Sequence, residues 1–145
     1  LFCHPHLSNT KKRFNSLKKT FDQLAPETAL TIGYPESVAE SKRVALMALM
    51  DRNRPDTVFC MGDMILIGVM YAVHELNLKV PEDIAIIGIS NGFIPTLYNP
   101  KITYVETSGY KLGKLAFVQM RDALKQEEIK SEVTLDSVLV EGGSL

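Results

Sequence analysis

Apolar residues recur most regularly in the central part of the chain, in three stretches separated by turn signals. An Arg-Pro-Asp turn sequence at residues 54–56 precedes a short β-branched and aromatic run at residues 57–60. An apolar-rich stretch at residues 64–76 follows, and a bend at residues 77–83 separates it from an apolar run at residues 84–89. Strand, helix and strand at these lengths predict a βαβ unit, which joins two parallel strands by a right-handed crossover.

Amphipathic helices are predicted on both sides of this unit. The first has apolar residues at intervals of three and four, namely Phe14, Leu17, Phe21 and Leu24. Pro26 ends this helix, and Asn9 or Thr10 is its expected N-cap. Residues 37–52 and 109–125 show the same kind of spacing. Each of the three stretches is therefore expected to cover a sheet with one face.

Further strands are predicted at residues 1–3 and 29–32, and a strand or extended crossing segment at residues 102–106. A final strand is predicted at residues 135–141, after which Gly142 and Gly143 end the ordered chain. Strand and helix thus alternate along the sequence, which is typical of the α/β class with a largely parallel sheet. We expect a three-layer αβα sandwich.

The run at residues 84–89 is apolar at every position and is therefore expected to be a central strand covered by helices on both faces. The helix at residues 64–76 is apolar on almost all sides, which indicates burial on more than one face. Its outer side either lies deep within the domain or meets a second subunit. Composition alone does not separate these two explanations.

Composition excludes several classes of partner. Of 145 residues, 46% are hydrophobic and 23% are charged, and the net charge of −1 provides no basic surface for nucleic acid or an anionic membrane. No apolar run approaches the roughly 20 residues that span a bilayer. Cys3 and Cys60 lie at the ends of predicted buried strands and are interpreted as reduced core thiols of a cytosolic protein. Since the sequence opens on Leu-Phe-Cys with no Met and no signal peptide, we expect a fragment of a longer polypeptide.

Candidate ligand groups gather where the predicted parallel strands end, which is where open α/β sheets bind ligands. Most are neutral hydrogen-bonding groups, suited to a polar uncharged ligand such as a sugar or nucleoside. They are His4, His6, Ser8, Asn9, Tyr34, Asp63, Ser90, Asn91, Thr107 and Ser108. The alternative explanation is that Ser and Asn simply populate loops. Asp63, between a strand and a helix, is more readily interpreted as an N-cap than as a ligand contact.

Signatures of catalysis and of metal binding are absent from the sequence. It contains no G-x-S-x-G, P-loop, G-x-G-x-x-G or H-E-x-x-H motif. Cys3, His4 and His6 have no metal-binding spacing and no nearby carboxylates. His74 is expected to be a solvated surface residue. We therefore expect no catalytic residues, no cofactor and no metal.

From Phe59 onwards the sequence resembles the lactose/galactose repressor family of bacterial transcription regulators. In that family an Asp opens an apolar helix ending A-x-x-E-L-G-L, followed by V-P-x-D, a strand closing on Gly-Phe/Tyr-Asp, a loop with L-T-T-V/I, and a helix beginning near Leu-Gly. The matching segments are Phe59-Cys60-Met61-Gly62-Asp63, Ala72-Val73-His74-Glu75-Leu76-Asn77-Leu78, Val80-Pro81-Glu82-Asp83, Ile87-Gly88-Ile89-Ser90-Asn91, Tyr98-Asn99-Pro100-Lys101-Ile102-Thr103-Tyr104-Val105 and Leu112-Gly113. Upstream, Arg13 to Leu17 is similar to the family's R-x-x-G helix start, with Ser16 in place of Gly.

This resemblance implies a type I periplasmic-binding-protein-like sensor, in which two α/β lobes close on a small effector. Residues 1–145 are similar mainly to the C-terminal lobe, and the helix at residues 109–127 belongs in the family to the other lobe. The DNA-binding domain and most of the N-terminal lobe are absent, so operator DNA would be bound only through the missing part. The resemblance further implies a cytoplasmic homodimer with no membrane contact.

Residue roles follow from the same resemblance. Arg13 matches an Arg that grips effector hydroxyls or carboxylates, and Ser90 stands where an Asp usually accepts hydrogen bonds. The expected ligand-binding residues are Arg13, Ser90, Asn91, Asp63, His6 and Tyr34. The expected dimer interface contains Ile67, Tyr71, Ile94 and Tyr98. The alternatives are a periplasmic sugar-binding protein of an ABC transporter and an α/β enzyme with an unrecognised site.

Overall fold

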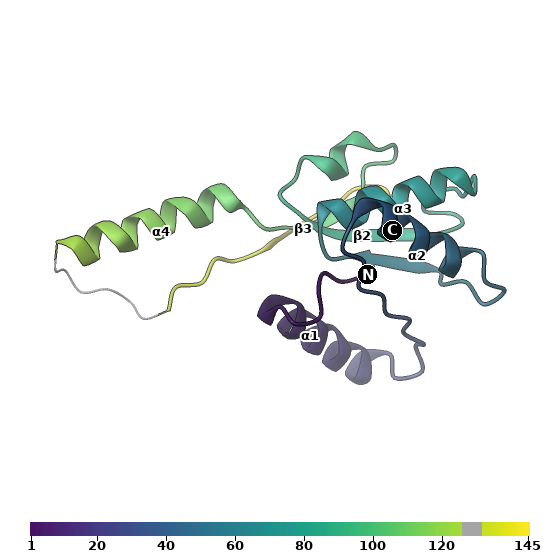
Figure 1. The fold of residues 1–145 in the computed structure, drawn as a ribbon, viewed down its shortest axis with the longest axis horizontal. Helices are drawn as coiled ribbons and strands as arrows, with labels where there is room; N and C mark the ends of the chain where they lie inside the picture. The colour runs from purple at the N-terminus through teal and green to yellow at the C-terminus, as the bar shows by residue number, and fades with distance from the viewer. Residues whose placement is uncertain (126–131) are drawn as a thin grey trace.

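The computed structural model describes residues 1–125 and 132–145 of the chain (Figure 1). The helices are α1 (Ser8–Leu24), α2 (Val38–Leu49), α3 (Asp63–Glu75) and α4 (Gly109–Leu124), with a short 3-10 helix η1 (Ile94–Leu97). The strands are β1 (Thr57–Cys60), β2 (Ala85–Ser90), β3 (Thr103–Glu106) and β4 (Val138–Val140). The predicted βαβ unit is confirmed as β1, α3 and β2.

The sheet has the strand order β1-β2-β3-β4. β1 pairs with β2, and β2 with β3, in parallel, whereas β3 and β4 are antiparallel. Residues 1–3 lie beside β1 without joining the sheet: the Met61 amide donates to the Leu1 carbonyl (3.0 Å), and the Phe2 amide donates to the Gly33 carbonyl (2.9 Å). The strands predicted at residues 1–3 and 29–32 are nevertheless not formed, since Pro5 and Pro35 interrupt the chain after these few bonds.

α2 and α3 cover one face of the sheet and are packed closely together. A side chain at Gly68 of α3 would lie 2.5 Å from the Ser41 Cβ and from the Val38 carbonyl oxygen of α2. The Ser41 hydroxyl donates to the Ile65 carbonyl at 2.8 Å, which satisfies a buried polar group within the contact. Glycine is therefore required for this helix crossing.

α1 covers the opposite face of the sheet, at the β1 edge. The Phe59 ring lies 5.6 Å from the Phe2 ring, which in turn meets the Phe14 ring of α1 edge-on at 5.7 Å. Because successive strand residues alternate between faces, Phe59 points away from α3, and the three-layer αβα order is confirmed. Ile87 and Ile89 remain half-buried on this face, so the expectation that residues 84–89 are covered fully on both sides is wrong. α1 does not extend far enough across the sheet.

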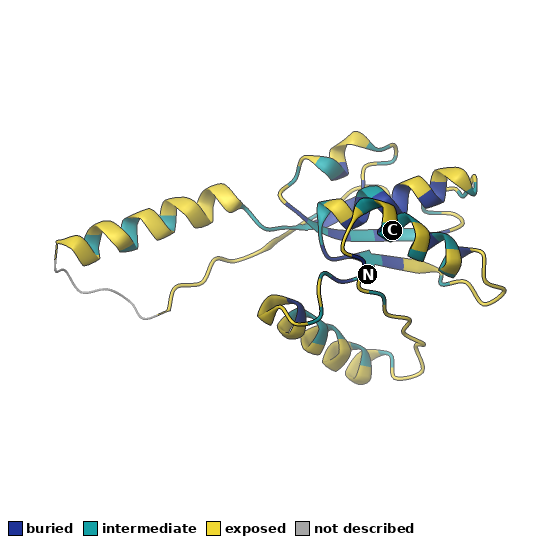
Figure 2. Ribbon diagram, viewed as in Figure 1, coloured by how far each residue is buried: buried dark blue, intermediate teal, exposed yellow. Residues whose placement is uncertain are grey.

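α4 projects from the sheet as a separate arm (Figures 1 and 2). None of its residues is buried, and its apolar side chains are largely exposed, with Tyr110 at 81% and Leu124 at 80%. Residues 132–137 run back along this arm to β4 (Figure 1). The helix predicted at residues 109–125 is thus present without a covering layer among the described residues.

The C-terminal tail is ordered beyond the glycine pair, contrary to the prediction. Ser144 is completely buried: its hydroxyl donates to the Ile86 carbonyl (2.6 Å) and accepts from the Thr103 amide (2.8 Å). A side chain at Gly142 would lie 2.2 Å from the Lys101 carbonyl oxygen. The glycines therefore do not end the structure but allow the tail to enter between the first residues of β2 and β3.

The predicted helix caps are corrected in two places. α1 begins at Ser8 with Leu7 as N-cap, and Thr10 is a buried residue within the helix, one turn before Phe14. α3 has Gly62 as N-cap, so Asp63 is its first residue and does not cap it. Neither helix has a side-chain hydrogen bond at its N-cap.

Candidate functional site

A hollow of about 450 Å³ lies at the carboxyl end of β3. This volume is in the range of small-molecule sites, roughly 300–1,000 Å³. α1, the β3 end, the first turn of α4 and the segment before β4 each contribute to it. Its lining residues are Arg13, Glu106, Thr107, Ser108, Gly109, Lys111, Leu112, Leu135, Asp136 and Ser137. The position agrees with the rule that parallel sheets bind ligands outside the carboxyl ends of their strands.

Arg13 is the predicted ligand-binding residue that the structure places in this hollow. It is partly buried in the second turn of α1, and its guanidinium has no hydrogen bond or ion pair with the residues that the structure describes. The Lys111 ammonium lies 3.6 Å from the Glu106 carboxylate. Arg13 is therefore available to a ligand, whereas Lys111 already has a partner.

Ser90 and Asn91 lie next to this hollow but are engaged in turns. The Ser90 hydroxyl accepts from the Gly92 amide (3.0 Å), and the Asn91 side-chain oxygen accepts from the Phe93 amide (3.2 Å). The Ser90 carbonyl accepts from the Thr107 amide at 2.9 Å. Ser90 thus holds Thr107, a lining residue, at the end of β3. Ser90 is buried and Asn91 is exposed.

The other predicted ligand residues lie outside the lining. The backbone amide of His6 donates to His4, whose ring lies 3.3 Å from the Glu36 carboxylate. The Tyr34 ring lies 6.3 Å from the Phe2 ring. Oδ1 of Asp63 is buried without a hydrogen-bond partner among the described residues, which leaves an acceptor unused at the end of β1. Ligand contact by these three residues stays a prediction.

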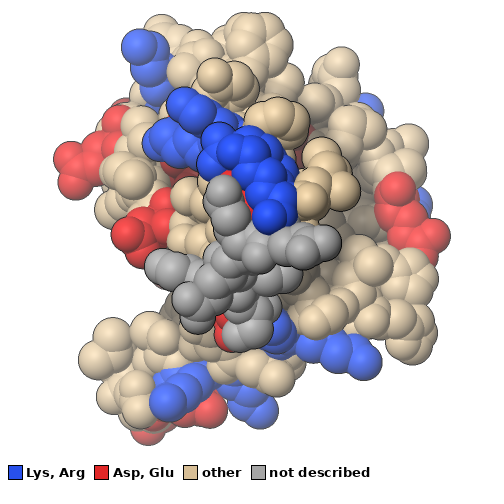
Figure 3. Space-filling model, turned by 90° about the vertical axis from the view of Figure 1, so that its left-hand side faces the viewer, with Lys and Arg blue, Asp and Glu red and all other residues tan. Residues whose placement is uncertain are grey.

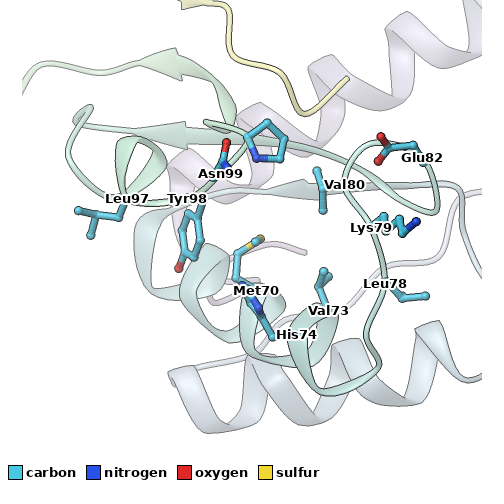
Figure 4. A pocket seen from close by; sticks show the side chains of 11 residues that line it. Met70, Val73, His74, Leu78, Lys79, Val80, Glu82, Leu97, Tyr98 and Asn99 are labelled. Atoms are coloured by element: carbon cyan, nitrogen blue, oxygen red, sulfur yellow. The ribbon is translucent and has the colours of Figure 1, made fainter.

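A second hollow, of about 600 Å³, lies beside the amino ends of β2 and β3 (Figure 4). Val73 of α3 and Val80 of the following bend face each other across it, and Tyr98 borders it (Figure 4). Burial raises the pKa of the Tyr98 phenol, and the nearby Tyr71 adds to the rise. This hollow is mainly apolar and lies at the opposite end of the strands from the Arg13 hollow.

The predicted dimer residues form one surface over α3 and η1. Tyr71 is 58% exposed, while Ile67, Ile94 and Tyr98 are partly buried. Exposed apolar side chains surround them, namely Met64, Phe93 and Leu97. The structure therefore places these residues on a surface that is uncovered in the single chain.

Charge and metal-binding groups add little elsewhere. Lys and Arg side chains gather at the end of the molecule formed by α4 (Figure 3). Within residues 1–125 and 132–145, no three His, Cys, Asp or Glu side chains are placed to hold a metal ion, and no helix there is long and apolar enough to cross a membrane.

His74 is exposed, as predicted. Cys3 and Cys60 are both free, and burial raises the pKa of the Cys60 thiol to about 12.

Sequence reasoning identified Arg13, Thr107 and Ser108 near the hollow but missed Lys111 and Asp136. The Arg13 signal came from a family pattern, and Thr107 and Ser108 came from their place after a strand. Asp136 reaches the hollow because β4 pairs antiparallel with β3, with Val138 opposite Glu106. No local pattern in the sequence indicates that pairing.

The chain belongs to the family of periplasmic binding protein-like domains, whose sequence model matches residues 1–145. A curated relative, the HTH-type transcriptional repressor PurR of Serratia proteamaculans, is 34% identical over 85 residues, which is 59% of this chain and 25% of the relative. These findings confirm the resemblance to the lactose/galactose repressor type. The matched part of this chain thus covers about a quarter of the length of this relative.

Solved structures show the same fold. A LacI family transcriptional regulator from Arthrobacter sp. FB24, in complex with lactose, superposes with a TM-score of 0.81 at 20% identity, covering 98% of this chain and 52% of that one. The dimeric Lac repressor with an 11-residue C-terminal deletion superposes with a TM-score of 0.85 at 18% identity, covering 99% and 53%. Against these structures this chain is equivalent to about half of each.

Proposed function

We propose that this chain is the effector-sensing and dimerisation part of a bacterial DNA-binding transcription regulator. The hollow at the carboxyl end of β3 binds a small polar molecule, and Arg13 supplies the main charged contact. The observation that carries the proposal is the unpaired Arg13 guanidinium in a hollow of ligand size. The match to PurR repressors supports a regulatory role over a transport or catalytic one.

The remaining parts of the proposal concern the whole protein. A DNA-binding domain outside this chain would bind the operator in the cytoplasm, and a second α/β lobe would close the hollow from the other side. The exposed apolar stripe of α4 supports such a lobe as its covering layer. A sugar or sugar-like effector is supported by the lactose-bound Arthrobacter structure, which has the same fold.

The first test is the substitution Arg13→Ala in the protein that carries this chain. Loss of a charge-assisted hydrogen bond should weaken effector binding by about 2 kcal/mol, or roughly 30-fold. Calorimetry measures this after a thermal-shift screen of neutral sugars and nucleosides. Lys12→Ala is the matched control, since Lys12 is an exposed cation one residue earlier on α1. Unchanged affinity in Arg13→Ala would remove this hollow as the effector site.

The second readout is operator binding. A gel-shift assay with DNA from upstream of the gene should show an affinity that changes when the effector is added. Binding of the effector without any effect on DNA would favour the alternative of a sugar-binding protein that serves a transporter.

A further inference from the structure

The hollow beside Arg13 contains two unlike charges that are not paired with each other. Lys111 and Glu106 form an ion pair at 3.6 Å. Arg13 and Asp136 line the same hollow, and neither has a hydrogen bond or ion pair with any residue in the described ranges 1–125 and 132–145. A guanidinium can only donate hydrogen bonds and a carboxylate can only accept them. The site therefore offers a free donor and a free acceptor to the same ligand.

The charges of the hollow also balance. Two cations and two carboxylates line it, and its other polar side chains are the hydroxyls of Thr107, Ser108 and Ser137. An anionic ligand would gain from Arg13 but would be repelled by Asp136 and Glu106, and a cationic ligand would meet the reverse. A hydroxyl group both donates and accepts, so neighbouring hydroxyls satisfy Arg13 and Asp136 together.

We infer that Asp136 is the specificity-determining acceptor of this site, where it selects the uncharged, hydroxyl-bearing effector of the proposed function over charged analogues. The inference rests on the proposed effector function of the hollow. It gives a ligand contact to the segment before β4, in addition to the contact from Arg13 of α1.

The backbone fixes the position of Asp136. Val138, two residues later, pairs with Glu106 at the carboxyl end of β3. The Asp136 side chain is exposed. A substitution there should change the chemistry of the hollow without unfolding the protein, which a melting temperature verifies.

The test compares Asp136→Ala and Asp136→Asn with Asp56→Ala, a matched exposed aspartate before β1 at the other end of the sheet. Calorimetry measures the binding of three neutral probes, D-ribose, D-galactose and adenosine. It also measures the binding of two charged analogues, D-galactose 6-phosphate and D-galactosamine. The expected result is that a neutral probe binds, and that Asp136→Ala weakens it about 10-fold or more through the lost charged acceptor. Asp136→Asn, which keeps an acceptor oxygen, should weaken binding of the neutral probe less than Asp136→Ala does. Asp56→Ala should leave the affinity for this probe unchanged.

If Asp136 had only a structural role, its substitution would not change the preference of the site between charged and neutral probes. Removing the carboxylate leaves the hollow with a net positive charge. Asp136→Ala should therefore raise the affinity for the phosphorylated probe relative to the affinity for its neutral parent. If Arg13→Ala weakens binding of the neutral probe but Asp136→Ala does not, the inference is overturned and the proposed function stands. Preference of the unmodified protein for a charged probe overturns the inference in the same way. Binding of none of the probes overturns both.

Discussion

α3 and α4 are both helices rich in apolar residues, of 13 and 16 residues, yet they lie in opposite environments. α3 buries seven residues between the sheet and α2, whereas α4 buries none. Gly68 of α3 has no room for a methyl group, while a side chain at Gly113 of α4 would meet no atom within 4 Å. Helical periodicity predicts both helices equally well.

The difference shows that an apolar stripe predicts packing against another element but does not indicate which element that is. α3 obtains it within the chain, because the βαβ crossover returns the helix to its own sheet. α4 follows β3 away from the sheet and, among the described residues, meets no second layer. Short helices in water depend mainly on such packing, so α4 should be the less stable of the two.

The largest expected effect is at the α2–α3 crossing. Gly68→Ala places a Cβ 2.5 Å from two α2 atoms and should lower the free energy of unfolding by about 3 kcal/mol. Gly113→Ala is the matched control and should stabilise α4 by up to about 1 kcal/mol through helix propensity. Urea denaturation measures the first and amide hydrogen exchange the second. Equal stability of the two variants would contradict the contrast between the helices.

A second substitution tests whether the outer face of α3, whose inner face is packed on the sheet, forms a dimer interface. Ile67→Asp puts a charge into the proposed dimer interface and should raise the dissociation constant about 30-fold or more, or at least about 2 kcal/mol. Sedimentation should then show monomers with an unchanged circular dichroism spectrum. Met47→Asp, at an exposed site on α2, is the control. Dimerisation is contradicted if the unmodified protein is monomeric at concentrations on the order of 50 µM.

A smaller effect is expected where the C-terminal tail enters the sheet. Ser144→Ala removes the partners of the Ile86 carbonyl and the Thr103 amide and should cost about 1.5 kcal/mol of unfolding free energy. Ser108→Ala removes the N-cap of α4 and should cost about 1 kcal/mol, confined to that helix. Thermal unfolding followed together with hydrogen exchange distinguishes them. A global loss of stability in Ser108→Ala would mean that α4 is coupled to the core.

The elements were largely predictable from the sequence, since they depend on local periodicity. Residues 57–60 form β1 as predicted, and the predicted helix at residues 64–76 differs from α3 by one residue at each end. The failures were at chain segments whose state depends on distant partners. Asn9 or Thr10 was predicted as the N-cap of α1, but the N-cap is Leu7 and Thr10 is buried within the helix. Gly143 was predicted to end the ordered chain, although Ser144 is among the most buried residues.

By itself, the sequence determined the α/β class, the βαβ unit and the strand ends at which polar groups gather, because apolar period and turn residues act over a few neighbours. The tertiary structure alone decided that β4 runs antiparallel to β3, that Asp136 therefore shares a hollow with Arg13, and that Gly68 must have no side chain. These features join residues far apart in the sequence. Their contact depends on how whole elements pack, which the pattern of any one segment does not encode.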